Sequence, residues 1–315
     1  MSVVHALYST PPPSLLHDKL EGEYGLKVLE IRFLKRGFND TYLVRTGKER
    51  FILRLFRQGR RSESEIRSEL NWLCFLQEKQ VPVSGALHDK KGGLLQTLDL
   101  AEGIRFAALF SFAEGKMIRK PDITQCYQAG EALGKLHKVS LDYNPGPLHW
   151  DYRPEQVISF VQNSIANCMK AYPADLQWLD ETANQIRARL SGVQLQAGLC
   201  HGDLQAENFY YEQDTVRFID FDFCGPGPLL YDLGAYTWYD HRAKTKEMLA
   251  RFYAGYASQM ELNRTQENLI PVFGMLRALF LMGMWNRFND GIQNPEWPAE
   301  QVHQFIQKLR TWSIK

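Results

Sequence analysis

The stretch H-G-D-L-Q-A-E-N-F-Y-Y-E-Q-D-T-V-R-F-I-D-F-D-F-C-G-P-G-P-L-L-Y-D, residues 201–232, decides how this chain of 315 residues is interpreted. A polar loop carries His201, Asp203 and Asn208, and a short apolar run after it ends at Asp220. Asp and Asn are common in turns, so each of these residues alone says little. Their combination is more informative: a loop, a hairpin, an acid at the end of an apolar strand, and a Gly-rich turn. This order predicts a functional site.

The residue types at these positions suit phosphoryl transfer. Asp203 and Asn208 are five residues apart, which matches the H-x-D-x-x-x-x-N catalytic loop of kinases. Mg²⁺ prefers hard oxygen ligands, and the Asn208 amide and the Asp220 carboxylate can each supply one. We expect Asp203 to orient the acceptor hydroxyl and to take its proton. ATP and Mg²⁺ are therefore the expected cofactors.

The same stretch resembles the aminoglycoside phosphotransferase and choline kinase superfamily of small-molecule kinases. Members resemble eukaryotic protein kinases in fold, with H-x-D-x-x-x-x-N and a later I-D-F/Y in place of H-R-D and D-F-G. The run I-D-F-D-F-C-G-P-G-P-L-L-Y-D-L, residues 219–233, is similar to the branch with bacterial homoserine-kinase-like and stress-response kinases. The resemblance extends from about Leu26 to Trp285. It is specific for the superfamily and says little about the substrate.

Hydrophobic periodicity predicts a β-rich first part of the chain. Ser14 can cap a short helix that runs to about Glu21. A helix over residues 62–80 has Ser62 as its N-cap, and Glu65 three residues later completes a capping box. Apolar alternation predicts the strands; we place them at residues 28–34, 41–46, 50–56, 94–98 and 105–112.

Helical patterns dominate after Gly115. They cover residues 123–138, 155–170, 176–190 and a series from 244 to the end, with short β runs near 208–211 and 216–221. We therefore predict an α+β, two-lobed, protein-kinase-like fold. Residues 1–112 form a small antiparallel β-rich lobe that binds the nucleotide, and residues 113–315 form a larger, mainly helical lobe for catalysis and substrate binding.

The resemblance implies a nucleotide site in the first lobe. Its third strand, R-F-I-L-R-L-F, has Arg54 where the family pattern has a phosphate-binding Lys. Arginine keeps the charge and can fork onto two phosphate oxygens, although its geometry differs. Glu69 on the following helix is the expected partner of this cation, and Glu65, one turn earlier, is the competing choice.

The nucleotide-covering loop is expected at residues 35–41, K-R-G-F-N-D-T. It is not G-x-G-x-x-G, but it resembles the shorter loop of small-molecule kinases, in which backbone N–H groups approach phosphate. Asn39 and Thr41 are the side chains that we place near the phosphates. The hinge that binds adenine is expected near Ser111 and Ala113, through backbone hydrogen bonds. A backbone contact leaves the choice between ATP and GTP open.

Further residues receive supporting roles. The resemblance implies that Asp232 steadies the catalytic loop, and we expect His201 to bond the loop backbone rather than take part in the chemistry. Asp222 lies either near the metal or near the acceptor, if it is not simply a polar residue on a short strand. We predict His137 to be a packed or capping histidine.

Composition excludes several classes of protein. The formal net charge is +1, so no global field favours nucleic acid or anionic lipid, and we interpret Arg57, Arg60 and Arg61 as a solvated helix start. The five scattered cysteines show no paired spacing, and no signal peptide is evident. The apolar run at residues 275–285 is too short to span a bilayer and predicts a core helix. A cytoplasmic protein without a membrane or nucleic-acid partner is expected.

The acceptor stays open. Aromatic faces suit a cationic amino alcohol through cation–π attraction, and Trp238 and Trp285 are our substrate candidates. Asp151 and Asp240 could instead receive the amines of an aminoglycoside. The aromatic residues of this region are Trp150, Tyr152, Tyr236, Trp238, Tyr239, Trp285 and Phe288.

Three functions are compatible with the sequence. The first is a kinase for a small molecule: an amino alcohol, a homoserine-like amino acid or an aminoglycoside. The second is a bacterial Ser/Thr protein kinase of the stress-response type, although no long activation segment with an A-P-E end follows Asp220. The third is a nucleotide-binding pseudokinase, which Arg54 favours and the intact Asp203, Asn208 and Asp220 disfavour. The oligomeric state is open.

Overall fold

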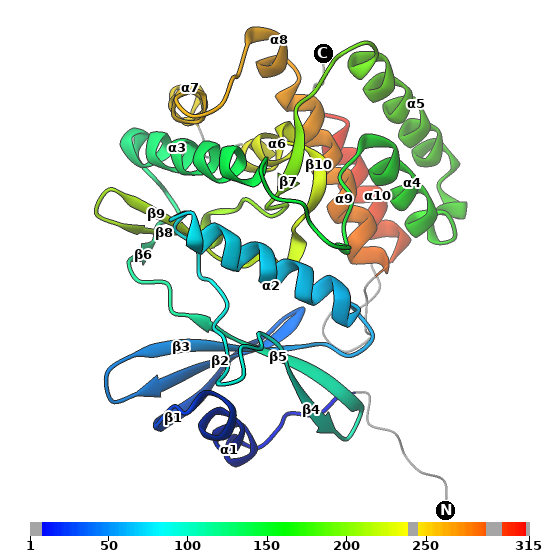
Figure 1. Cartoon of the computed structure of the whole chain (residues 1–315). Coiled ribbons are helices and arrows are strands. Elements are labelled where there is room, and N and C mark those ends of the chain that lie inside the picture. The colour runs from blue at the N-terminus through cyan, green and yellow to red at the C-terminus, as the bar shows by residue number, and fades with distance from the viewer. Residues whose placement is uncertain (1–7, 239–244, 288–297, 313–315) are drawn as a thin grey trace, which may run out of the picture. The chain divides into compact units, whose positions relative to one another are not determined.

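The computed structural model describes residues 8–238, 245–287 and 298–312, and the chain forms two compact units. Unit 1 comprises Met1–Glu114 together with two later segments, Tyr143–His149 and Arg217–Ile219. Unit 2 comprises Gly115–Asp142, Trp150–Val216 and Asp220–Lys315. Figure 1 shows that strands make up much of the first and helices most of the second. The mixed fold with a small antiparallel sheet and a helical region agrees with the predicted class.

Unit 1 is built on a five-stranded antiparallel sheet with the order β1-β2-β3-β5-β4. All five predicted strands are present, with ends that differ by up to two residues. Two helices, α1 (Pro13–Tyr24) and α2 (Glu63–Glu78), accompany the sheet. The strands are β1 (Val28–Arg36), β2 (Asn39–Thr46), β3 (Arg50–Phe56), β4 (Gln96–Leu100) and β5 (Gly103–Ser111).

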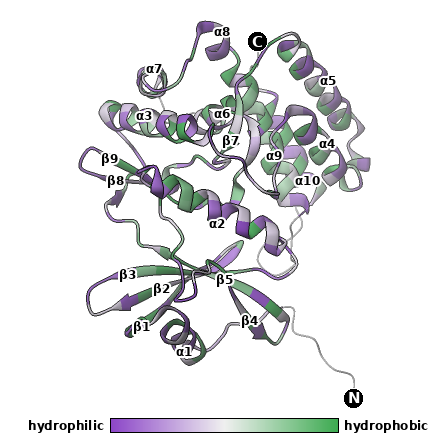
Figure 2. Ribbon diagram, in the orientation of Figure 1, coloured by the Kyte–Doolittle hydropathy of each residue, from purple (hydrophilic) through white to green (hydrophobic). Residues whose placement is uncertain are grey.

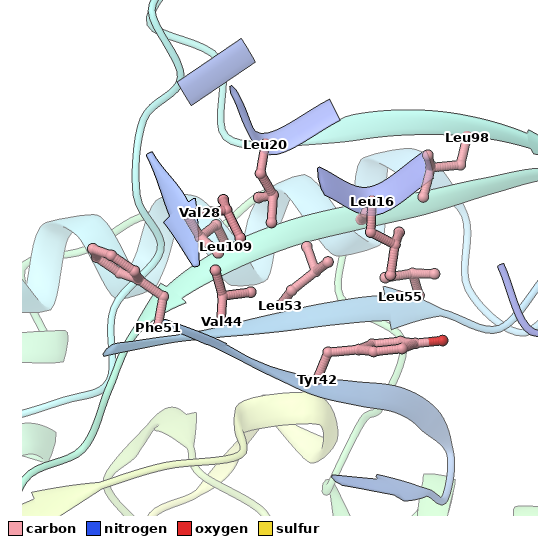
Figure 3. Packing of buried hydrophobic residues seen from close by; sticks show 11 residues of the cluster. Leu16, Leu20, Val28, Tyr42, Val44, Phe51, Leu53, Leu55, Leu98 and Leu109 are labelled. Atoms are coloured by element: carbon pink, nitrogen blue, oxygen red, sulfur yellow. The ribbon is translucent and has the colours of Figure 1, made fainter. Parts of the chain in front are cut away.

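The alternation in β3 assigns the two faces of this sheet. Phe51, Leu53 and Leu55 point to one face, where Leu16 and Leu20 of α1 pack with them (Figure 3). Leu16 and Leu20 are each 1% exposed, and burying such a side chain is worth about 1.5–3 kcal/mol. Figure 2 shows β3 and β5 coloured largely as hydrophobic. The intervening residues of β3 therefore face the other side.

The start of α2 agrees with the prediction. The Ser62 side chain accepts a hydrogen bond from the Glu65 N–H, and the Glu65 carboxylate accepts one from the Ser62 N–H. The reciprocal bonds satisfy two donors that a helix start would otherwise leave open. The capping box is confirmed.

Two segments from later in the chain belong to unit 1, which the sequence analysis did not predict. The Phe218 N–H donates to Pro82 O at 3.0 Å, and the Ser84 N–H donates to Phe218 O at 2.9 Å. In the other segment, the rings of Tyr143 and Phe75 lie 4.9 Å apart. Backbone and ring contacts of this kind can join segments that are far apart in sequence.

Unit 2 is organised around α9 (Ile270–Arg287), nearly all of whose side chains are buried. The stretch Arg264–Arg287 is apolar and long enough to cross a membrane by composition, but 83% of its most apolar window is buried inside the protein. This confirms the predicted core helix. The other helices are α3 (Ile123–Ser140), α4 (Pro154–Ile165), α5 (Pro173–Leu190), α6 (Leu230–Trp238), α7 (Lys246–Ala257), α8 (Arg264–Glu267) and α10 (Ala299–Leu309).

Short strands complete unit 2 and correct one interpretation. The sequence predicts that the run G-P-G-P is part of a Gly-rich turn, but it forms strand β10 (Gly225–Pro228), antiparallel to β7 (Ala197–Cys200). Proline is tolerated because this sheet has only two strands, so each has an open edge. A second small sheet has the order β6-β8-β9, with β6 (Lys116–Met117), β8 (Phe209–Glu212) and β9 (Thr215–Phe218).

Helices α3 and α7 approach each other closely at Gly130. A Cβ atom at this position would lie 1.9 Å from the Phe252 carbonyl oxygen. Since a backbone oxygen cannot swing away as a flexible side chain can, the approach requires glycine.

We predict opposite effects for two helical glycines. Gly130→Ala should lower the free energy of unfolding by about 1–3 kcal/mol, because the added methyl group overpacks the contact with α7. Gly22→Ala in α1 should raise it by up to about 1 kcal/mol, because nothing lies within 4 Å and alanine is the better helix former. Urea unfolding checks both, and a stabilised Gly130→Ala would contradict the close approach.

Candidate active site

The loop at residues 201–208 is held by the carboxylate of Asp232 on α6. Its Oδ2 accepts a hydrogen bond from the His201 N–H at 2.7 Å, and its Oδ1 accepts one from the Gly202 N–H at 2.8 Å. Gly202 has φ +82°, and a Cβ atom there would lie 2.1 Å from Phe223 O. Glycine is therefore required at this position of the loop.

His137 on α3 completes the surroundings of Asp232. Its Nε2 lies 3.0 Å from Asp232 Oδ2, and its Nδ1 lies 3.0 Å from the Tyr256 hydroxyl. Burial raises the pKa of Tyr256, so this hydroxyl stays protonated and can donate a hydrogen bond to Nδ1 of His137. The His137 ring then donates from Nε2 to the carboxylate. His137 is fully buried and packed, as expected from the sequence.

Asp203 is fixed by three side chains. The amide nitrogens of Asn208 and Gln205 donate to its Oδ2, at 3.0 and 2.9 Å. Arg277 on α9 forms an ion pair with its Oδ1. Asp203 is 6% exposed and Arg277 is 0% exposed, so this charge pair lies away from bulk water. The carboxylate is therefore held in one orientation.

His201 and Asn208 shape the backbone of the same loop. The His201 ring accepts a hydrogen bond from the Asp203 N–H at 3.3 Å and packs against Phe221, with ring centres 4.4 Å apart. Asn208 also donates its amide to Asp203 O at 2.8 Å. Both bonds of Asn208 use the amide nitrogen, so Oδ1 is the atom that a metal ion would take.

Asp220 adopts a left-handed backbone conformation, with φ +64° and ψ +65°. This region is unfavourable for residues other than glycine, and backbone strain of this kind is found at functional sites. Hydrogen bonds hold the backbone of two residues that follow. Trp150 Nε1 donates to Asp222 O at 3.3 Å, and the Tyr152 hydroxyl donates to Phe223 O. Asp222 is itself buried, at 3% exposure.

The donors in unit 2 fit Mg²⁺. Asn208 and Asp220 offer an amide oxygen and a carboxylate, and Mg²⁺ in phosphate chemistry uses one or two carboxylates besides water and phosphate oxygens. Within residues 8–238, 245–287 and 298–312, no three His, Cys, Asp or Glu side chains gather to hold a metal. The donor set therefore suits an ion that phosphates help to bind.

Unit 1 contains a buried cluster of two cations and one acid. Arg54 on β3 donates to Glu69 Oε1 at 3.3 Å, and Arg61 pairs with Glu69 Oε2. Glu69 is 0% exposed. Glu65, the competing choice, instead caps α2 and lies 3.2 Å from His149 Nδ1. Burial works to raise the pKa of the Glu65 carboxyl, but the Ser62 N–H and His149 hold it below its usual value.

The predicted nucleotide loop lies on the same face of the sheet as Arg54. Thr41 pairs with Arg54 across β2 and β3, so the two side chains are neighbours on one face. The Asn39 side-chain oxygen accepts a hydrogen bond from the Arg57 N–H at 3.3 Å. The Arg60 guanidinium lies 3.5 Å from the centre of the Phe38 ring.

These contacts correct the interpretation of the arginine cluster. Arg61 is only 8% exposed and is ion-paired with Glu69, and Arg57 and Arg60 contact the predicted nucleotide loop. Sequence alone suggested a solvated helix start because acidic residues follow at once. Arg61 and Glu69 are eight residues apart, and no hydrophobic periodicity in the sequence indicates that they pair.

The predicted hinge is partly occupied by internal bonds. The Ser111 N–H donates to Gly85 O at 3.0 Å, and Ser111 O accepts a bond from the Ser84 hydroxyl. A backbone N–H that is already donated is a poor donor for a base. Of the two predicted residues, Ala113 is therefore the better candidate for an adenine contact.

Three of the five aromatic candidates that the structure describes are core residues. Trp150 stacks on Phe223, Tyr152 on Tyr231 and Tyr236 on Phe252, with ring centres 5.5, 4.0 and 3.7 Å apart. Trp238 and Trp285 are half-buried, and both contact Phe305. Tyr239, Asp240 and Phe288 lie outside the described residues.

Two residues of the sites were missed by the sequence analysis. Gln205 stands inside the quoted loop, and Arg277 lies inside the apolar run at residues 275–285, from which we predicted only a core helix. The signal that could have identified Arg277 is its charge within an apolar run. Arginine is almost never fully buried unless it is paired, so a buried acidic partner could have been expected. Nucleophilic catalysis by Cys200 has no support: burial raises the pKa of its thiol well above the usual value, and the Asp232 carboxylate adds to the effect.

The model of the phosphotransferase enzyme family matches residues 30–267. A homoserine kinase of Rhodopseudomonas palustris (strain BisB18) is 25% identical, over 98% of each chain. The structure of a microcompartment-associated aminopropanol kinase superposes with a TM-score of 0.75 and 23% identity, covering 96% of this chain and 100% of the other. An amicoumacin kinase in complex with AMP-PNP, Ca²⁺ and Ami has a TM-score of 0.71 and 20% identity, over 94% and 92%.

Asp232→Asn should destabilise the protein. The carboxylate faces three donors, from His201, Gly202 and His137, whereas an amide has one oxygen and turns its NH₂ toward another donor. At least one buried N–H then lacks an acceptor, which costs about 1–3 kcal/mol. Urea unfolding measures the loss.

Asp214→Asn in the exposed β8–β9 turn is the matched control and should change stability by less than about 0.5 kcal/mol. Equal stabilities of the two variants would show that Asp232 does not organise the loop.

Proposed function

We propose that this chain, which belongs to the phosphotransferase enzyme family, transfers the γ-phosphate of ATP to a hydroxyl group of a small molecule. The family and the similar kinases support a phosphotransferase that acts on an alcohol group. The observation that carries the proposal is the fixed Asp203 carboxylate, in a loop held by Asp232, together with Asn208 and the strained Asp220.

Asp203 is assigned as the general base. The acceptor oxygen forms a bond to the γ-phosphorus, the bond from that phosphorus to the β–γ bridging oxygen breaks, and ADP leaves. The hydroxyl proton moves to an Asp203 carboxylate oxygen. The contacts from Asn208, Gln205 and Arg277 support this role, because a base with one fixed orientation is held ready for its substrate.

Asn208 and Asp220 are assigned as the metal ligands. When bound, Mg²⁺ neutralises phosphate charge and lowers the barrier to transfer. The chain's own contribution is to hold the Asn208 amide, through its bonds to Asp203, and to fix the backbone of Asp222 and Phe223, which follow Asp220. Asp222 is kept as a candidate for metal or acceptor contact.

Arg54 and the loop with Asn39 and Thr41 are assigned to the phosphates of ATP. A guanidinium can bind two phosphate oxygens at once, and its ion pair with Glu69 fixes its position. Ala113 is assigned to the adenine through its backbone. The complex of the similar amicoumacin kinase with AMP-PNP supports a nucleotide site in this family.

The acceptor is proposed to be a small amino alcohol or hydroxy amino acid. The similar proteins are described as kinases of homoserine, aminopropanol and amicoumacin, so the fold accepts several alcohols. Half-buried Trp238 and Trp285 are the described residues that we assign to a cationic group of such a substrate.

A panel of acceptors tests the proposal. ATP consumption with Mg²⁺ is measured with homoserine, 1-amino-2-propanol, ethanolamine, choline, hydroxylysine, several aminoglycosides and a generic protein. We expect turnover with one small alcohol. Asp203→Asn should lower turnover by about 10²- to 10⁴-fold, because it cannot take the proton, and should leave ATP affinity nearly unchanged.

Asp214→Asn, in an exposed turn, is the control and should retain full turnover. Labelling of protein alone would favour a protein kinase. ATP binding without transfer to any acceptor would favour a pseudokinase. Full turnover by Asp203→Asn would refute the assignment of the base.

A further inference from the structure

Arg277 is a buried cation in a helix that is otherwise apolar except at its C-terminal end. It lies in the middle of α9, and its side chain is 0% exposed. Its guanidinium pairs with the Asp203 carboxylate and lies 5.7 and 5.5 Å from the ring centres of Phe223 and Phe280. A cation in such surroundings requires a counter-ion, because an isolated charge is expensive to bury. Asp203 is that counter-ion.

The energy of this pair does not explain its presence. Buried ion pairs contribute little net stability, because the cost of desolvating both charges offsets their attraction, and apolar residues of similar volume often stabilise the fold as well or better. An apolar residue at 277 would match the rest of α9. The pair is therefore better understood through its effect on Asp203, the proposed base.

The position of Arg277 relates two parts of the proposed site. On one side it holds Oδ1 of Asp203, while Asn208 and Gln205 hold Oδ2. On the other side it faces the ring of Phe223, three residues after Asp220, and this ring is itself stacked on Trp150. A single side chain thus contacts both the base and the segment that follows the proposed metal ligand.

We propose that Arg277 is a positioning residue for phosphoryl transfer, which fixes the orientation of the Asp203 carboxylate by charge and hydrogen bonding. This inference rests on the proposed function. It makes no claim that Arg277 touches the substrate. A substitution of Arg277 should therefore lower turnover only when Asp203 is present. A double-mutant comparison can measure this dependence.

A double-mutant cycle measures it. Arg277→Met, Asp203→Asn and the double variant are compared with the wild type in ATP consumption with Mg²⁺ and the fastest acceptor of the panel, or with water as the acceptor if none is faster. We expect Arg277→Met to lower kcat by about 10- to 100-fold, as misplacement of a reacting group does, with KM for ATP changed less than about threefold. In the Asp203→Asn background, Arg277→Met should cause no further loss.

Two further variants separate positioning from folding. Arg277→Lys keeps the charge and should recover part of kcat, and it replaces Arg277→Met in the cycle if the latter does not fold. Arg287→Met, at the exposed end of the same helix, should leave kcat unchanged. Thermal unfolding of each variant shows which of them are folded at the assay temperature.

The outcomes distinguish the inference from the proposed function. Full kcat in Arg277→Met, or losses that multiply in the double variant, would overturn the positioning role while leaving Asp203 as the base. A kcat loss that Arg277→Lys does not relieve would also count against it. Unchanged turnover in Asp203→Asn would instead overturn the proposed function itself.

Discussion

The candidate site depends on one buried carboxylate, that of Asp232. Three donors converge on it, two from consecutive backbone N–H groups of the loop and one from the ring of His137. Because Asp232 lies on α6, which packs against the buried helix α9, the loop is tied to the core of unit 2. Every other contact of Asp203 and Asn208 presupposes that this loop has a fixed backbone.

Ion pairs with little exposure to solvent recur in both units. In unit 2 Arg277 pairs with Asp203, and in unit 1 Arg54 and Arg61 pair with Glu69. Such pairs add little net stability, but they fix the positions of charged groups in space. Phosphoryl transfer needs fixed charges more than it needs reactive side chains, because its catalysis is largely positioning and electrostatic stabilisation. The arrangement is therefore consistent with the family to which the chain belongs.

Local pattern predicted much of the fold and of the candidate site. The alternation in β3 assigned its faces, and Ser62 with Glu65 predicted the start of α2, because both depend on near neighbours in sequence. The partner of Asp203 could not be found this way: Arg277 is 74 residues away, and nothing local indicates which acid it meets. Strand β10 was missed because Gly and Pro normally argue against a strand, and only its pairing with β7 makes one.

In the proposed reaction, phosphate passes from ATP to an acceptor hydroxyl under the control of Asp203. The most direct test is ³¹P nuclear magnetic resonance of a mixture of the protein, Mg²⁺, ATP and an active alcohol. We expect a phosphomonoester signal that grows in step with ADP in the wild type and grows about 10²- to 10⁴-fold more slowly in Asp203→Asn. Release of inorganic phosphate alone, or an ester signal of equal rate in the variant, would contradict it.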